Sequence, residues 1–108
     1  MTALQARKPR IGLHLPLEVT GNDVVGTPFI QTTRTLNVSA GGVCFESSRA
    51  LAVGARLVLQ IQLPPALRRH FRGRAVYRVR ALVCRVERLP SQPQARVGAR
   101  FLGEAEAE

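Results

Sequence analysis

The chain alternates between apolar and polar residues in several short stretches, which is the pattern of half-buried β-strands. The most regular stretches are residues 11–19, 56–63 and 95–101. Their apolar positions, spaced two apart, are Ile11, Leu13, Leu15, Leu17, Val19, Leu57, Leu59, Ile61, Leu63, Ala95, Val97, Ala99 and Phe101. Each stretch predicts a strand with one face in a core. Pro16 has no backbone N–H to donate, so we expect an edge or a bulge at this position.

Three further segments predict strands with less regular patterns. Residues 29–38 are rich in threonine, and residues 43–46 restart the two-residue period after a polar turn. We expect Leu36 and Val38 to share the half-buried face ahead of that turn. In residues 74–87, Tyr77, Val79, Ala81 and Val83 share one parity, and Cys84 and Val86 then share the other. Such a change within one strand predicts a bulge or a bend between sheets.

The connecting segments are rich in Gly, Pro and polar residues. We expect turns at 20–23 and 26–28, loops at 47–55 and 90–93, and one helical turn within 66–71. Six strands and no amphipathic helix of ordinary length predict a small antiparallel barrel or sandwich. We expect this domain to span residues 11–102, after a mobile arm at 1–10 and before an acidic tail at 103–108, with Gly103 ending the last strand.

Composition indicates one globular domain with a real core, because 45% of the 108 residues are hydrophobic and 21% are charged. No apolar run is long enough for membrane insertion, and residues 1–5 lack the apolar core of a signal peptide. We therefore expect a cytoplasmic location. Cys44 and Cys84 lie in apolar runs, where we expect small buried hydrophobes. Two isolated cysteines argue against zinc, and a cytoplasmic chain argues against a disulfide.

The net charge of +9 comes almost entirely from arginine, since Lys8 is the only lysine. Guanidinium groups bind phosphate and guanine edges and stack on bases, so the charge favours an anionic partner. Nucleotides, nucleic acids, acidic proteins and lipid surfaces all qualify. A general bias of the composition towards Ala and Arg explains the total charge equally well, so the positions of the arginines must decide.

Two segments offer binding chemistry. The first is the turn at residues 37–42, where Asn and Ser bond nearby backbone groups and Gly41 and Gly42 permit positive φ or close backbone approach. The second is the basic run Arg7-Lys8-Pro9-Arg10 ahead of the first strand. Either one alone is explained by a hairpin corner or a frayed terminus. We find no catalytic triad, paired acids or phosphate-binding glycine loop, so we expect neither an enzyme nor a cofactor.

Together, and in this order, the two segments resemble the PilZ domain family. In that family an Arg-x-x-x-Arg segment precedes the first strand, and an (Asp/Asn)-x-Ser-x-x-Gly turn follows the second. Asn37-x-Ser39-x-x-Gly42 resembles the turn, and Val97-Gly98-Ala99-Arg100-Phe101 resembles the closing strand. Gly54 followed by a regular strand is a further similarity. The resemblance covers residues 6–102 and implies a six-stranded antiparallel β-barrel.

The resemblance also implies a function, because PilZ domains bind the bacterial second messenger cyclic di-GMP. The ligand-binding residues that it implies are Arg7, Lys8 and Arg10 of an arginine arm and Asn37, Ser39 and Gly42 of the turn. The arm would wrap around the dinucleotide, while the turn would bond a guanine. The implied protein is a receptor that changes its surface on binding and regulates an unidentified partner protein in motility, biofilm or pilus control.

The arm departs from the family spacing, because its arginines stand at Arg7-x-x-Arg10. We align Arg10 with the second family arginine, since it directly precedes the strand, and this alignment places Ala6 at the first. One alternative is a PilZ-like module that does not bind the nucleotide and acts through protein contacts. Another is a nucleic-acid-binding barrel that uses the arginines between 68 and 80. Aromatic residues make up only 5% of the chain, too few for a base-stacking surface.

Overall fold

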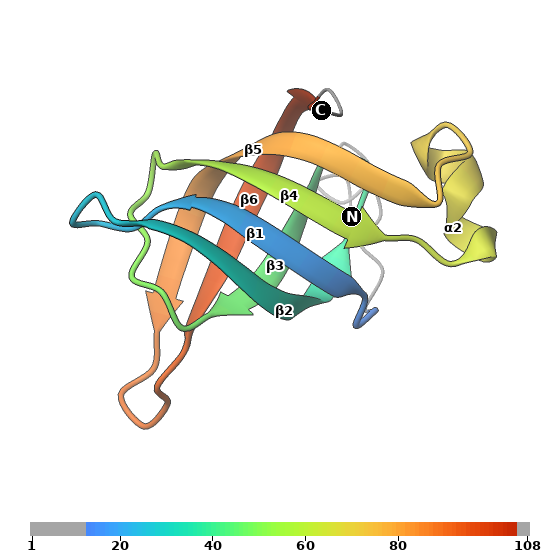
Figure 1. The fold of residues 1–108 in the computed structure, drawn as a ribbon. Coiled ribbons are helices and arrows are strands. Elements are labelled where there is room, and N and C mark those ends of the chain that lie inside the picture. Colours follow the sequence, from blue (N-terminus) through green and yellow to red (C-terminus); the bar gives the residue numbers. More distant parts are fainter. Residues whose placement is uncertain (1–12, 106–108) are drawn as a thin grey trace, which may run out of the picture.

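A computed structural model describes residues 13–105, which form a closed antiparallel barrel with strand order β1-β2-β3-β6-β5-β4 (Figure 1). The strands are β1 (Pro16–Asn22), β2 (Pro28–Val38), β3 (Gly42–Ser47), β4 (Arg56–Gln62), β5 (Val76–Arg88) and β6 (Ala95–Glu104). The predicted six-stranded β-barrel is confirmed. No helix within these residues is long and apolar enough to cross a membrane.

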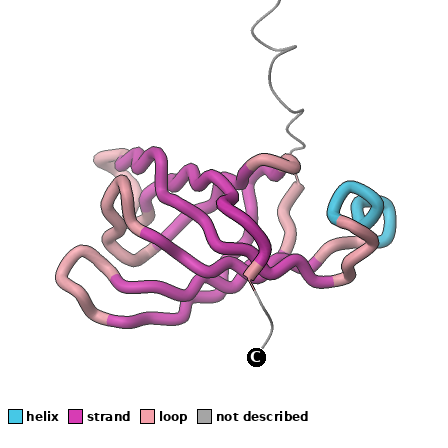
Figure 2. Tube along the Cα trace, turned by 90° about the horizontal axis from the view of Figure 1, so that it is seen from above, coloured by secondary structure: helices cyan, strands magenta, loops and turns pink. Residues whose placement is uncertain are grey.

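The predicted helical turn is present between β4 and β5. It consists of α2 (Pro65–Arg68) followed by the 3-10 turn η1 (Arg69–Phe71). Pro65 occupies the first turn of α2, where its missing N–H costs nothing. The segment stands at one end of the barrel (Figure 2), and it is anchored there because Leu67 and Phe71 are buried in the core cluster.

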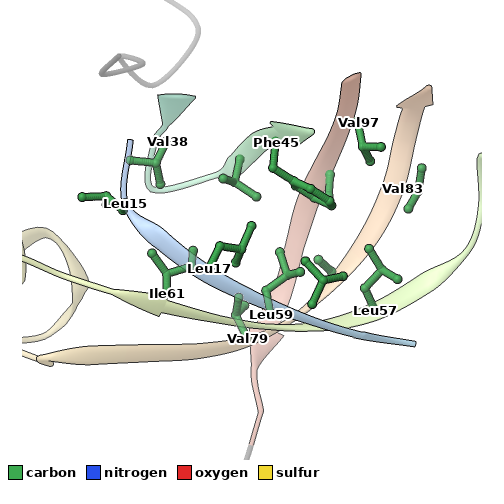
Figure 3. Packing of buried hydrophobic residues seen from close by; sticks show 14 of the residues in the cluster. Leu15, Leu17, Val38, Phe45, Leu57, Leu59, Ile61, Val79, Val83 and Val97 are labelled. Carbon is green, nitrogen blue, oxygen red and sulfur yellow. The ribbon is translucent and has the colours of Figure 1, made fainter. Parts of the chain in front are cut away.

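The barrel interior is filled by the apolar residues that alternate along the strands. Side chains from every strand meet there, as Figure 3 shows for ten labelled residues. Phe45 on β3 is the largest fully buried side chain. The apolar residues with no exposed surface are Val19, Val43, Phe45, Leu59, Ile61, Val79, Ala81, Val83 and Val97. Burying each large aliphatic or aromatic side chain stabilises the fold by about 1.5–3 kcal/mol.

The strand ladders differ in regularity. The β1–β2, β1–β4, β4–β5 and β3–β6 pairs keep one register throughout. The β2–β3 ladder shifts between Thr35 and Asn37. The β5–β6 ladder shifts at Arg80/Ala81 and again between Val83 and Arg85. The second shift in β5 confirms the bulge that the change of parity predicts.

The prediction that Leu36 and Val38 share one face of β2 ahead of the turn is wrong. Leu36 is only half-buried, whereas Thr35 is fully buried and Val38 is 1% exposed. The cause is the register shift between Thr35 and Asn37, which interrupts the two-residue period. The sequence carries a signal for it, because the buried residues Phe29 and Val38 have opposite parity.

The start of the barrel also differs from the prediction. Leu13 and Leu15 pack on the core but precede the strand, which begins at Pro16 and runs to Asn22. The expected turn therefore begins later, at Asp23, whose carboxylate accepts hydrogen bonds from the N–H groups of Val25 and Thr27. Pro16 marks no edge, because the barrel is closed, and a first strand position tolerates the missing donor.

Two further predictions are corrected. Cys44 is buried as expected, but Cys84 is exposed, because the shift between Val83 and Arg85 interrupts the alternation there. The last strand ends at Glu104, one residue beyond Gly103. The Glu104 carboxylate is held by Arg74, with Nε 3.0 Å from Oε2. The division of the chain into arm, barrel and acidic tail stays a prediction.

Candidate ligand-binding site

The polar turn between β2 and β3 is closed by hydrogen bonds of its own residues. The Ser39 N–H donates to the Gly42 carbonyl at 2.9 Å, and the Gly41 N–H donates to Ser39 Oγ at 3.1 Å. Ser39 is 8% exposed. Its hydroxyl only accepts a hydrogen bond within residues 13–105, so the hydroxyl proton remains available to an external acceptor.

Gly42 seats this turn against β6. A Cβ at this position would lie 2.6 Å from the Ala99 carbonyl oxygen, so no larger residue fits without a backbone shift. The φ angle of Gly42 is not in the left-handed region, and the glycine is therefore needed for close approach. The Gly41 carbonyl also accepts the Phe101 N–H at 3.0 Å. The turn is held rigidly on its neighbouring strand.

Asn37 lies just after the register shift in β2. It is half-buried and pairs with Cys44 of β3. Bulges commonly re-aim a side chain next to a functional site. The barrel thus brings Asn37, Ser39 and Gly42 together at one corner, which we name the β2–β3 corner.

The chain entering the barrel is tied to the same corner through Thr35. The Thr35 N–H donates to the Leu15 carbonyl, and Thr35 Oγ1 accepts the Leu15 N–H, both at 2.9 Å. The same hydroxyl donates to the Leu13 carbonyl. Thr35 is the residue that our reading of the sequence missed, and the parity change along β2 is the signal that would have found it.

The predicted arm residues Arg7, Lys8 and Arg10 lie outside the described residues. The structure therefore describes the turn residues of the predicted site and Leu13, the first described residue after the arm. Within residues 13–105 no cluster of three or more His, Cys, Asp and Glu side chains is arranged to hold a metal.

The arginines between 68 and 80 are partly engaged in the fold. Arg68 Nε donates to the Leu63 carbonyl at 3.1 Å, and Arg72 and Arg74 both face Glu104. Three of the four phenylalanines, Phe29, Phe45 and Phe71, are buried. This surface therefore lacks the exposed rings that single-stranded nucleic acids stack on, which argues against the nucleic-acid alternative.

Tyr77 is the one described group with a clear pKa shift. Burial raises the pKa of its hydroxyl above the ordinary value, the Glu104 carboxylate raises it further, and Arg72 lowers it. Its ring packs between Phe71 and Phe101, with centroids 4.8 and 5.4 Å away. Tyr77 therefore belongs to the aromatic packing at the start of β5, and it contacts Phe101, whose N–H donates to the Gly41 carbonyl of the turn between β2 and β3.

The described residues form a small closed barrel with a polar corner that is closed by its own hydrogen bonds. The sequence model of the PilZ domain matches residues 5–108. The chain belongs to the PilZ domain family, as its motifs indicate. No curated protein sequence matches it.

Solved structures support the fold. The inhibitor of motility MotI/DgrA from Bacillus subtilis superposes with a TM-score of 0.69 at 18% identity; the match covers 92% of this chain and 43% of that one. The PilZ domain of YcgR from Escherichia coli, solved with cyclic di-GMP, gives 0.58 at 16% identity, covering 89% and 76%. The PilZ domain of CeSA from a cellulose-synthesizing bacterium gives 0.56 at 18%, covering 90% and 83%.

Proposed function

We propose that this protein binds cyclic di-GMP at the β2–β3 corner and thereby changes the surface that it offers to a partner protein. The observation that carries the proposal is the rigid corner itself. It holds Asn37 at the end of β2 and Ser39 at the start of the turn two residues apart, and Thr35 fastens the incoming chain next to them. Membership of the PilZ family supports this ligand.

The chemistry of the corner suits a guanine base. A carboxamide offers both a donor and an acceptor, and a hydroxyl offers either, so the pair matches the mixed donors and acceptors on a guanine edge. Because the turn is already closed by its own hydrogen bonds, little conformational entropy is lost when a ligand binds there.

The arm residues are within reach of this corner. Arg10 stands three residues before Leu13, and three residues of chain span at most about 11 Å. Leu13 is itself bonded to Thr35, two residues before Asn37. Arg7, Lys8 and Arg10 would bind the phosphates and guanine edges of the dinucleotide, and ordering of this segment would create the new surface.

The regulated partner is part of the proposal. MotI/DgrA, which has a similar fold, is an inhibitor of motility, and this supports motility as one candidate process beside biofilm and pilus control. The expectations of a cytoplasmic location and of no enzymatic activity stay predictions.

Isothermal titration of the full chain with cyclic di-GMP, and with GTP as control, tests the ligand. We expect saturable heat at micromolar cyclic di-GMP and none with GTP. Arg10→Ala and Ser39→Ala should each weaken binding about tenfold, because each removes a direct hydrogen bond to the ligand. Ser91→Ala, in the exposed loop before β6, is the matched control.

A second candidate function rests on the alanine at position 6, where the family pattern has arginine. It is a protein-contact module that does not bind the nucleotide. Absence of heat at high concentrations of the folded wild-type chain would contradict the first proposal and favour this one.

A further inference from the structure

A row of residues crosses the outer face of the barrel from the β2–β3 corner. Asn37 of β2 pairs with Cys44 of β3, Cys44 pairs with Gly98 of β6, and Gly98 pairs with Arg85 of β5. The row points outwards, because the adjacent residues Val43, Ala99 and Val86 lie in the core cluster or pack against it. With strands about 4.8 Å apart, Asn37 and Arg85 stand about 14 Å from each other at their backbones.

The middle of this row carries little side-chain bulk. Gly98 has no side chain, and Cys44 is small and covered by its surroundings, with 2% of its surface exposed. Gly42, the next outward position along β3, is also bare. These three residues form a floor, bounded on one side by Asn37 and Ser39.

Arg85 bounds the floor on its other side. Its side chain lies back across Gly98: its Cζ and Nη2 atoms are 3.7 and 3.5 Å from the position that a Cβ of Gly98 would take. The guanidinium therefore reaches towards Cys44 and away from β5. The register shift between Val83 and Arg85 sets this placement, just as the shift in β2 sets that of Asn37.

Arg100 bounds the same floor along β6. It pairs directly with Gly42 and is exposed, and Ala99 beside it faces the core. Within residues 13–105 neither Arg85 nor Arg100 forms an ion pair or a hydrogen bond through its side chain. Both guanidiniums therefore keep their full set of donors for an anion.

We propose that Arg85 and Arg100 grip the phosphates of the bound dinucleotide from the barrel side and supply the charge that the arm lacks at Ala6. This inference rests on the proposed function and adds two ligand-binding residues outside the arm and the turn. Guanidinium forks bind phosphate oxygens through paired hydrogen bonds and stack on purine faces.

The test is titration of cyclic di-GMP into Arg85→Ala, Arg100→Ala and Arg85→Lys. The control is Arg56→Ala, which removes an equally exposed arginine from β4. We expect both alanine variants to weaken binding about tenfold or more, because each loses charge-assisted hydrogen bonds. Arg85→Lys should recover only part of the loss, since lysine keeps the charge but not the fork. Arg56→Ala should change the dissociation constant less than threefold.

Thermal melting of each variant separates ligand contact from folding. We expect unchanged melting temperatures without ligand, because these side chains are exposed and make no bonds within the described barrel. Suppose that the wild type binds but that Arg85→Ala and Arg100→Ala bind no more weakly than the control Arg56→Ala, whether or not the three variants lose affinity. The assignment of Arg85 and Arg100 is then overturned, while the proposed function stands. If the folded wild type does not bind, both are overturned.

Discussion

Two sides of the barrel differ in the regularity of their strands. Every ladder made by β1 and β4 keeps a single register, whereas the ladders that join β2 to β3 and β5 to β6 contain shifts. We name these the regular side and the bulged side. The regular side alternates simply between core and solvent. The bulged side carries the rigid turn and the row from Asn37 to Arg85. Register shifts on this side change which side chains face the candidate site. A sheet of constant register would only alternate core-facing and solvent-facing residues.

From this difference we expect the ligand to bind on the bulged side, while the rest of the barrel serves mainly as a scaffold. Both sides contribute to one shared core, so the rigidity of the regular side holds the bulged side in place. We therefore expect core substitutions to destabilise the whole barrel. The effect of a substitution near a bulge should come from the local contact that it removes or adds, which a matched control can isolate.

The largest effect is expected in the shared core. Phe45→Ala empties the largest fully buried side-chain site and should lower the free energy of unfolding by about 3–5 kcal/mol. Urea denaturation followed by circular dichroism measures it. Val76→Ala, on the exposed face of β5, should cost less than 1 kcal/mol. Equal losses in the two variants would mean that the core is not shared as described.

A smaller effect is expected where the turn meets β6. Gly42→Ala pushes a methyl group against the Ala99 carbonyl and should cost about 1–3 kcal/mol. Gly98→Ala is the matched control, because its new Cβ makes only ordinary contacts. Denaturation midpoints for both variants decide the question. If Gly98→Ala were as destabilised as Gly42→Ala, the inference that Gly42 is needed for close approach to the Ala99 carbonyl would be contradicted.

Thr35 should have an effect of similar or smaller size. Thr35→Val keeps the shape but leaves the Leu15 N–H and the Leu13 carbonyl without their partner, which should cost about 1–3 kcal/mol. Thr32→Val, on the exposed face of β2, should change the stability by less than 0.5 kcal/mol. An unchanged stability of Thr35→Val would show that the hydroxyl does not fasten the incoming chain.

The smallest effect concerns the pH dependence of the stability. Because burial raises the pKa of Tyr77, its stabilising contribution is fully present below the unfolded-state pKa near 10 and is lost as the pH rises through the folded-state pKa. The stability of the wild type should therefore fall relative to Tyr77→Phe above pH 10. Denaturation of both proteins between pH 8 and 11 measures this difference. If the stability difference between the wild type and Tyr77→Phe stays constant over this range, the raised pKa of Tyr77 is contradicted.

The regular side was predictable from single-strand patterns. Leu57, Leu59 and Ile61 alternate without interruption, and they lie in the core as expected. The turn residues also came from a local motif. The bulge in β5 followed from parity alone, and the same rule applied to Phe29 and Val38 would have turned Thr35 inwards.

The rest of the site depends on partners that are remote in sequence. Arg85 is paired with Gly98, and Gly98 with Cys44, only through the registers of two ladders, so no pattern within β5 marks Arg85 as a site residue. The exposure of Cys84 was missed for the same reason, because the residue that a bulge turns outwards depends on the neighbouring strand.

The most direct measurement is NMR mapping of cyclic di-GMP binding on the full chain, using backbone amide shifts. The account predicts changes concentrated at Asn37–Gly42, Gly98, Arg85 and Arg100, with β1 and β4 largely unaffected. Changes centred on β1 and β4 would contradict the claim that the bulged side binds the ligand, as would the absence of any change at saturating ligand.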